Sequence, residues 1–193
     1  MAAVSAPYGL IPVRSMVGSG TNAGLNRLYK VGDSYATDIF YGDIVSLSAG
    51  VIIKSTATTA TAAMIGVFQG CTYTDATLKY KVHKKNWVGG TVSTDIQAYV
   101  CDDPFMIYQA QADGAIGQTG LGENANLIQT NGTDAIGMSR VTIDATTVVT
   151  NGLPVRIVGF VDGPDSAVGD AFTDVLVMLN PLHAQLLVTT GVT

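Results

Sequence analysis

The stretch Gly42-Asp43-Ile44-Val45-Ser46-Leu47-Ser48-Ala49-Gly50-Val51-Ile52-Ile53-Lys54 decides how this chain folds. Two apolar, β-branched runs flank Ala49-Gly50, and the first run alternates apolar with polar side chains. Alternation with a period of two places successive side chains on opposite faces of a strand, and glycine at the junction suits a tight turn. We therefore predict a β-hairpin over residues 43–54.

The rest of the chain repeats this pattern of short apolar runs between turn residues. Thr, Val and Gly are abundant, whereas Glu occurs only at Glu123, a composition that disfavours helices and suits pleated sheets. Only residues 120–129 are predicted as a short helix. Further strands are predicted over residues 26–31, 64–68, 78–82, 86–88, 96–101, 105–112, 141–143, 154–161 and 173–179. We predict an all-β or β-rich fold, a small β-barrel or sandwich with an extended N-terminal arm.

The chain is expected to divide into an arm and one large domain. Residues 1–25 form the extended arm, because two prolines favour extended backbone and glycines between residues 18 and 24 form a hinge. Residues 26–193 form the β-rich domain, with a Gly/Asn-rich insertion near 113–140 and a loop or exposed edge over 55–63. An extended arm with apolar residues packs either on its own domain or on a neighbouring molecule, and both remain open here.

Composition limits the class of protein. Hydrophobic residues make up 47% and charged residues only 13% of the chain, against a usual charged share of about 25%. This indicates a folded chain with surface hidden in an assembly rather than disorder. No apolar run approaches the roughly 18 residues of a membrane helix, and no signal peptide is recognisable, so we expect no membrane partner and synthesis in a cytoplasm. Cys71 and Cys101 are predicted to be buried free thiols, although a bridge between them stays possible.

The charges are distributed unevenly. Residues 1–94 contain eight Lys or Arg and four Asp, a net +4, whereas residues 95–193 contain two Arg, ten Asp and one Glu, a net −9. Either one end of the folded molecule faces an acidic partner, or folding interleaves the two halves and evens out the field.

One basic cluster carries interleaved aromatic residues, which could touch nucleic acid through phosphate contacts and stacking. The sequence pI of about 4.7 and the small size of the cluster oppose that function. We expect a solvated hairpin face or a contact with an acidic protein, and no nucleic-acid partner. The cluster comprises Lys79, Tyr80, Lys81, Lys84, Lys85 and Trp87.

No catalytic, cofactor or metal site is predicted. Gly32-Asp33-Ser34 is similar to the Gly-Asp-Ser block of a family of serine esterases, which pair it with Asp-x-x-His near the C-terminus. This chain has Asn180-Pro181-Leu182-His183 there, and Asn lacks the negative charge that stabilises an imidazolium. The two cysteines and two histidines are scattered singly, unlike the ligands of a structural zinc site.

Five stretches stand out together by their order along most of the chain. They are residues 6–10, 41–45, 65–71, 98–104 and 159–164. In this order they resemble small virion structural proteins of tailed bacteriophages, especially marine ones, and more narrowly their capsid decoration (cement) proteins.

The resemblance implies a non-enzymatic protein on the outside of an icosahedral capsid, with the major capsid protein and copies of itself, often as homotrimers, as partners. We further expect residues 6–14 to contact the shell or the next protomer, and their removal to abolish shell binding without unfolding the domain. The expected contact residues are Pro7, Tyr8, Leu10, Ile11, Pro12 and Arg14. Alternatives are a tail or fibre adaptor and, less favoured, the major capsid protein or a serine esterase.

Overall fold

The computed structural model describes residues 4–17, 26–56 and 63–187. Its regular structure is almost entirely β, as the sequence predicted. The strands are β1 (Ile11–Ser15), β2 (Asn26–Lys30), β3 (Ile44–Ser48), β4 (Val51–Lys54), β5 (Gly66–Thr74), β6 (Lys81–Lys84), β7 (Gln97–Cys101), β8 (Met106–Gln111), β9 (Asn124–Ala125), β10 (Leu127–Ile128), β11 (Thr142–Ile143), β12 (Val155–Phe160) and β13 (Asp174–Leu179). Two short 3-10 turns, η1 (Gln118–Gly120) and η2 (Ala145–Thr147), are its helical elements.

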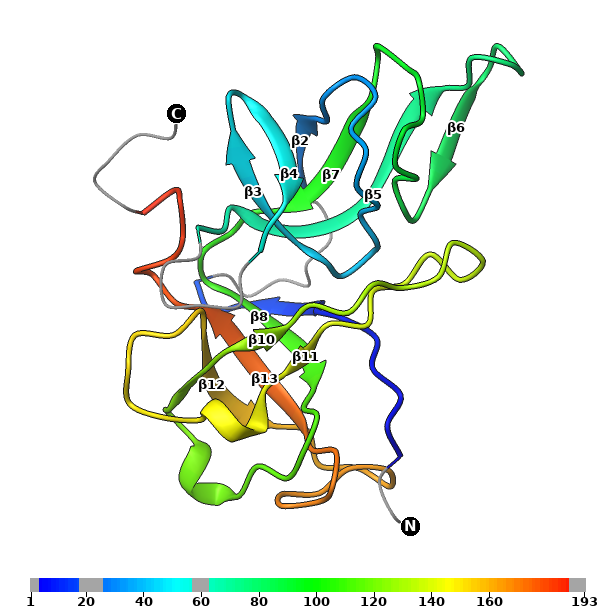
Figure 1. Ribbon diagram of the computed structural model, residues 1–193. Helices are drawn as coiled ribbons and strands as arrows, with labels where there is room; N and C mark the ends of the chain where they lie inside the picture. The colour runs from blue at the N-terminus through cyan, green and yellow to red at the C-terminus, as the bar shows by residue number, and fades with distance from the viewer. Residues whose placement is uncertain (1–3, 18–25, 57–62, 188–193) are drawn as a thin grey trace.

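The strands form an upper and a lower lobe (Figure 1). The upper sheet has the order β2-β7-β5-β3-β4, with β6 paired to β5. The lower sheet has the order β1-β8-β13-β12-β9, and β10 and β11 form a separate two-stranded ribbon. All strand pairs are antiparallel, which suits the short connections between them.

The predicted hairpin over residues 43–54 is present as β3 and β4. Val45 pairs with Lys54 and Ser48 with Val51, so Ala49 and Gly50 form a two-residue connection. Both connecting residues have positive φ, 47° and 79°. A two-residue hairpin turn of this kind matches the right-handed twist of its strands, which fixes the register.

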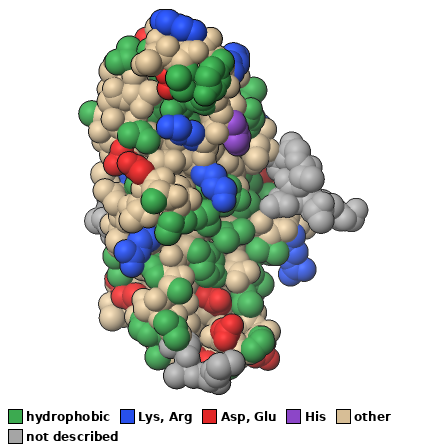
Figure 2. Space-filling model, turned by 90° about the vertical axis from the view of Figure 1, so that its right-hand side faces the viewer, with side chains coloured by type: hydrophobic (Ala, Val, Ile, Leu, Met, Phe, Trp, Pro, Cys, Tyr) green, Lys and Arg blue, Asp and Glu red, His purple; other side chains and the backbone are tan. Residues whose placement is uncertain are grey.

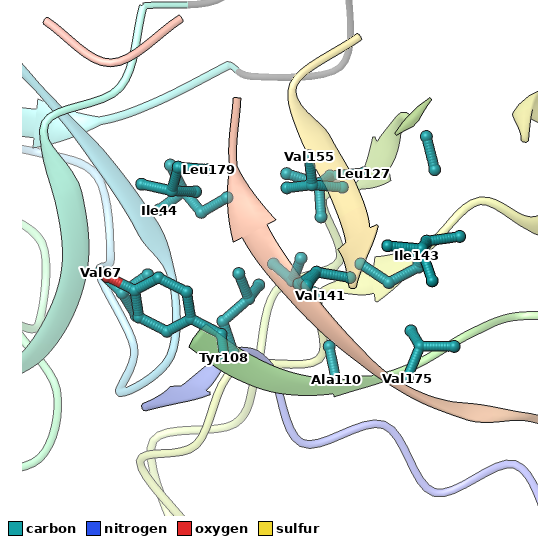
Figure 3. Packing of buried hydrophobic residues seen from close by; sticks show 14 of the residues in the cluster. Ile44, Val67, Tyr108, Ala110, Leu127, Val141, Ile143, Val155, Val175 and Leu179 are labelled. Atoms are coloured by element: carbon teal, nitrogen blue, oxygen red, sulfur yellow. The ribbon is translucent and has the colours of Figure 1, made fainter. Parts of the chain in front are cut away.

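Each lobe has a buried core, and side chains of the upper sheet enter the lower core. Figure 3 shows the ring of Tyr108, on β8, beside Val67 of β5, and Ile44 of β3 beside Leu179 of β13. The Tyr108 hydroxyl donates a hydrogen bond to the Cys101 carbonyl at 3.1 Å, so the buried phenol keeps a partner. This shared packing joins the two lobes.

Two details of the fold differ from the prediction. The helix expected over residues 120–129 is wrong: η1, β9 and β10 occupy this region, and Gly122 has a φ of 89°. The pairing of β9 with β12 and of β10 with β11 satisfies the backbone there, so tertiary pairing overrides a weak helical pattern. The upper sheet curls until Val31 bridges Ile52, but the described residues form no closed barrel.

No helix in the described part of the chain has the length and apolar character needed to cross a membrane.

Candidate interaction surface

The N-terminal arm lies against the body of its own chain. β1 pairs with β8 from Ile11 opposite Gln109 to Ser15 opposite Met106, and so forms one edge of the lower sheet. Leu10 is fully buried, and its amide donates to the Gly42 carbonyl at 3.0 Å. Of the two arrangements left open by the sequence, the described arm therefore follows the one in which it packs on its own domain. Residues 18–25, which include the predicted glycine hinge, lie outside the described residues.

The six expected contact residues differ in how far they are buried. Leu10 and Pro12 are buried within this chain, so their side chains belong to its own core. Pro7, Tyr8 and Ile11 are half-buried, and Arg14 is exposed. This arrangement opposes the expectation that residues 6–14 can be removed without unfolding, because their removal would empty the Leu10 site and expose the edge of β8.

The start of the arm is fixed by polar contacts with the lower sheet. The Ala6 amide donates to the Gln111 side-chain oxygen at 2.8 Å, and the Gln111 amide group donates to the Val4 carbonyl at 3.2 Å. Burial, with the nearby Asp174 carboxylate, raises the pKa of Tyr8 far above its usual range. Burial also raises the pKa of Asp174. Tyr8 is therefore a neutral, partly buried anchor at physiological pH.

Between the arm and the loop that precedes β11 lies a small apolar depression of about 280 Å³, which we call the arm hollow. Ile136, on its rim, is 67% exposed. An apolar hollow next to an exposed apolar side chain offers a partner both a depression to fill and a side chain to cover. The hollow is lined by Pro7, Tyr8, Thr133, Ile136, Met138, Ser139 and Arg140.

A buried ion pair positions the loop that forms one wall of the arm hollow. Asp43 is fully buried, and its carboxylate lies 2.8 Å from the Lys54 ammonium. The same carboxylate accepts hydrogen bonds from the Phe40 amide at 2.9 Å and from the Ser139 hydroxyl at 2.6 Å. Lys54 in turn donates to the Asn131 side chain at 2.8 Å. The β3–β4 hairpin thus holds both ends of the loop over residues 131–139.

Close backbone contacts bring the arm and this loop together. Gly9 has a φ of 77°, and a Cβ atom built on it would lie 2.7 Å from the Ser139 side chain. A Cβ on Gly42 would lie 3.1 Å from the Leu10 nitrogen. Only glycine tolerates such conformations and spacings, so these residues permit the arm to approach the loop that lines the hollow.

The basic cluster lies next to this loop, on the same face. The Asn86 side chain donates to the Asp134 carboxylate at 2.9 Å, which fixes the tip of the loop beside Lys85. Lys79, Tyr80 and Lys81 are exposed on the β5–β6 hairpin. Figure 2 shows this face, with several lysine and arginine side chains from its top to just below its middle and hydrophobic side chains across its middle.

Trp87 does not belong to the exposed cluster. It is fully buried, packs edge-on against Tyr73 at a centroid distance of 5.6 Å, and donates its indole N–H to the Tyr35 carbonyl at 3.0 Å. An indole held in this way is a core residue of the upper lobe and cannot stack on a base.

The esterase-like residues and the two cysteines do not form a site together. Ser34 is exposed after β2 with a φ of 58°, whereas His183 is buried with its Nε2 atom 3.1 Å from the Gly152 carbonyl. Cys71 and Cys101 are buried free thiols, as predicted, and burial raises the pKa of Cys71 to about 12. The described residues contain no group of three or more His, Cys, Asp or Glu side chains placed to hold a metal ion.

A larger depression of about 490 Å³ lies between the two 3-10 turns, and Glu123 is among the residues that line it. Its other lining residues include four that are Gly or Ala and offer little side chain for recognition; the full set is Ala115, Ile116, Gly117, Thr119, Gly120, Ala145, Val148, Val149 and Thr150. The arm hollow has stronger anchoring features, because an exposed Ile and an Arg border it.

Sequence reasoning identified the arm but missed the loop over residues 131–139. The available signal is Ile136, a large aliphatic residue in a stretch otherwise made mostly of small and polar residues. The sequence predicts only the start of a strand at Asp43, since nothing local reveals that Lys54 and Ser139 surround it.

Comparison with protein-family models, with curated proteins and with solved structures found no match for this chain.

Proposed function

We propose that this chain is a non-enzymatic structural protein of a tailed-bacteriophage virion that binds the outer surface of the icosahedral capsid as a cement, or decoration, protein. The observation that carries the proposal is the arm hollow, a preorganised apolar depression flanked by an exposed Ile136. The order of the five sequence stretches supplies the identity of the partner, the major capsid protein, and the homotrimer as the expected assembly.

The physical features of the surface suit such a role. An apolar side chain of the capsid protein would fill the hollow while Ile136 loses its contact with water, at roughly 25 cal/mol per Å² of apolar surface buried. A contact made by one or two side chains is weak, but many identical copies of the protein on one capsid lattice bind with high avidity. Binding to the assembled shell then stabilises that shell by mass action.

The first experiment is to count copies of the chain in purified virions, relative to the major capsid protein. A ratio near one copy per capsid subunit is expected for a protein that covers the lattice. A few copies per particle would instead favour the tail or fibre adaptor, and absence from the virion would overturn the proposal.

The second experiment tests the surface itself. We expect Ile136→Asp to abolish binding to shells that lack the protein, because a carboxylate at the rim of the hollow would have to be desolvated. The matched control is Leu182→Asp, which introduces the same charge at an equally exposed Leu. Leu182 belongs to segment 181–187, on the side of the molecule away from the arm in Figure 1.

Both variants replace exposed residues, so both are expected to retain the wild-type thermal unfolding midpoint. Shell binding is measured by co-sedimentation at several protein concentrations. Equal binding by wild type and Ile136→Asp would exclude the arm hollow as the contact, even if the copy number supported the virion assignment.

A further inference from the structure

The two ends of the molecule carry opposite charges. The basic hairpin, which we define as residues 66–85, contains four Lys and one Asp, a net +3. It comprises β5, β6 and their connection, and it projects at the top of the molecule in Figure 1. Residues 76–81 are exposed without interruption, which leaves Leu78, Lys79 and Tyr80 open to contact.

The opposite end is acidic. The connection from β12 to β13 and the first residue of β13, residues 161–174, contain four Asp and no Lys or Arg, a net −4; we call this segment the acidic end. Asp174 pairs with Gln111, the last residue of β8, so the acidic end lies where β8 ends. Figure 1 shows this connection at the bottom of the lower lobe, far from β6.

Folding places these two segments of opposite charge at opposite ends of the molecule. In the space-filling view, a basic side chain lies at the top and several acidic ones lie near the bottom, while basic side chains also occur around mid-height (Figure 2). Elsewhere charges from the two halves of the sequence meet, as in the ion pair between Arg27 and Asp102. The described residues therefore combine the two arrangements that the sequence left open. A molecule with such separated charges has an electrostatic field that orients its partners.

The lysines of the basic hairpin are only partly offset by acids of their own chain. Among the described residues, ion pairs form only between Arg27 and Asp102 and between Lys54 and Asp43. The Asp75 and Asp95 carboxylates lie near enough to attract Lys79, Lys81 and Lys84. Asp95 also accepts hydrogen bonds from the Thr74 amide and hydroxyl at 2.8 and 2.6 Å, and Asp75 from the Leu78 amide at 2.9 Å. Two carboxylates offset only part of the charge of four lysines, so the hairpin keeps a net positive charge.

We propose that the basic hairpin docks onto the acidic end of a second copy of this chain. Two basic hairpins would repel each other, and the two ends of one molecule are too far apart to meet, so the contact joins unlike surfaces of different copies. Such a head-to-tail contact is heterologous and closes into a ring when its rotation permits. The exposed Leu78 and Tyr80 side chains supply apolar contact around the lysines.

The proposal is tested with a charge swap in the full-length chain. Lys79→Glu/Lys81→Glu changes the net charge of the hairpin from +3 to −1, and Asp162→Lys/Asp165→Lys changes that of the acidic end from −4 to 0; all four residues are exposed. Sedimentation velocity over a concentration series measures association at low and high ionic strength. Wild type is expected to associate at low ionic strength and to dissociate as salt screens the contact.

Each variant alone should associate at least about tenfold more weakly than wild type, because the contact then joins two negative surfaces, or a positive surface to an uncharged one. An equimolar mixture of the two should regain association in pairs, since the intact hairpin of the acidic-end variant meets the intact acidic end of the hairpin variant. A wild type that stays monomeric at low ionic strength, variants that associate like wild type, or a mixture that does not recover would each overturn the proposal. The assay contains no capsid, so its result is separate from the test of shell binding.

Discussion

At the scale of single residues, Asp43 connects the parts of the interaction surface. Its buried carboxylate meets Lys54, the Phe40 amide and the Ser139 hydroxyl, which come from β4, from the segment before β3 and from a distant loop. The side chains of Asp43 and Lys54 are 0% and 10% exposed. A buried ion pair contributes little net stability over apolar residues, but removal of one partner leaves an uncompensated charge.

Asp43→Asn is therefore expected to lower the free energy of unfolding by about 3 kcal/mol, because the Lys54 ammonium would remain buried without its counter-ion. Urea unfolding followed by Trp fluorescence measures the change. The control is Asp43→Asn/Lys54→Met, which removes both charges and should recover much of the loss. A single variant as stable as wild type would show that the pair is not held as described.

At the scale of elements, β1 is both an N-terminal arm and a structural edge strand. Its residues pair with β8, and Leu10, just before it, is part of the lower core. The arm therefore fixes the sheet edge and one wall of the arm hollow together. Loss of its core contacts affects the stability of the whole lower lobe.

Leu10→Ala is expected to lower the free energy of unfolding by about 3 kcal/mol, the usual cost of emptying a fully buried Leu site. Val13→Ala, in the adjoining strand β1 but exposed, should change it by no more than about 0.5 kcal/mol. Both are measured by urea unfolding. If the two variants lost equal stability, the burial of Leu10 by the arm would be contradicted.

At the scale of the whole molecule, many ionisable groups are buried in their neutral form. Burial raises the pKa of Cys71 to about 12 and, with a hydrogen bond to Asp102, that of Tyr29 to about 12. Burial likewise raises the pKa of Cys101 and of Tyr108. In the unfolded chain these groups ionise nearer their ordinary values, 9.0 for Cys and 10.0 for Tyr.

The free energy of unfolding is therefore expected to be insensitive to these groups below pH 9 and to fall progressively between pH 9 and about 12. In that range the unfolded chain binds fewer protons than the folded one, so rising pH favours unfolding. Urea unfolding at a series of alkaline pH values measures the fall. Cys71→Ser should reduce its slope, because a hydroxyl does not titrate there, and a constant free energy of unfolding up to pH 11 would contradict the burial of these groups.

Local sequence patterns determined the strands of this protein. Alternation and the Ala49-Gly50 turn were enough to identify the β3–β4 hairpin, because period and turn geometry are properties of adjacent residues. The β-rich class followed from many such segments. The short pattern over residues 120–129 failed because two glycines and long-range strand pairing outweigh a weak helical preference.

Only the tertiary structure decided what these strands enclose. The meeting of Leu10, Asp43 and Ser139 joins residues far apart in the chain, and no local pattern encodes which distant side chain fills a cavity or neutralises a buried charge. The sequence by itself determined the unequal charge of the two halves, since charge is a sum over residues. The placement of residues 66–85 and 161–174 at opposite ends arose from the packing of the first segment in the upper lobe and of the second in the lower lobe.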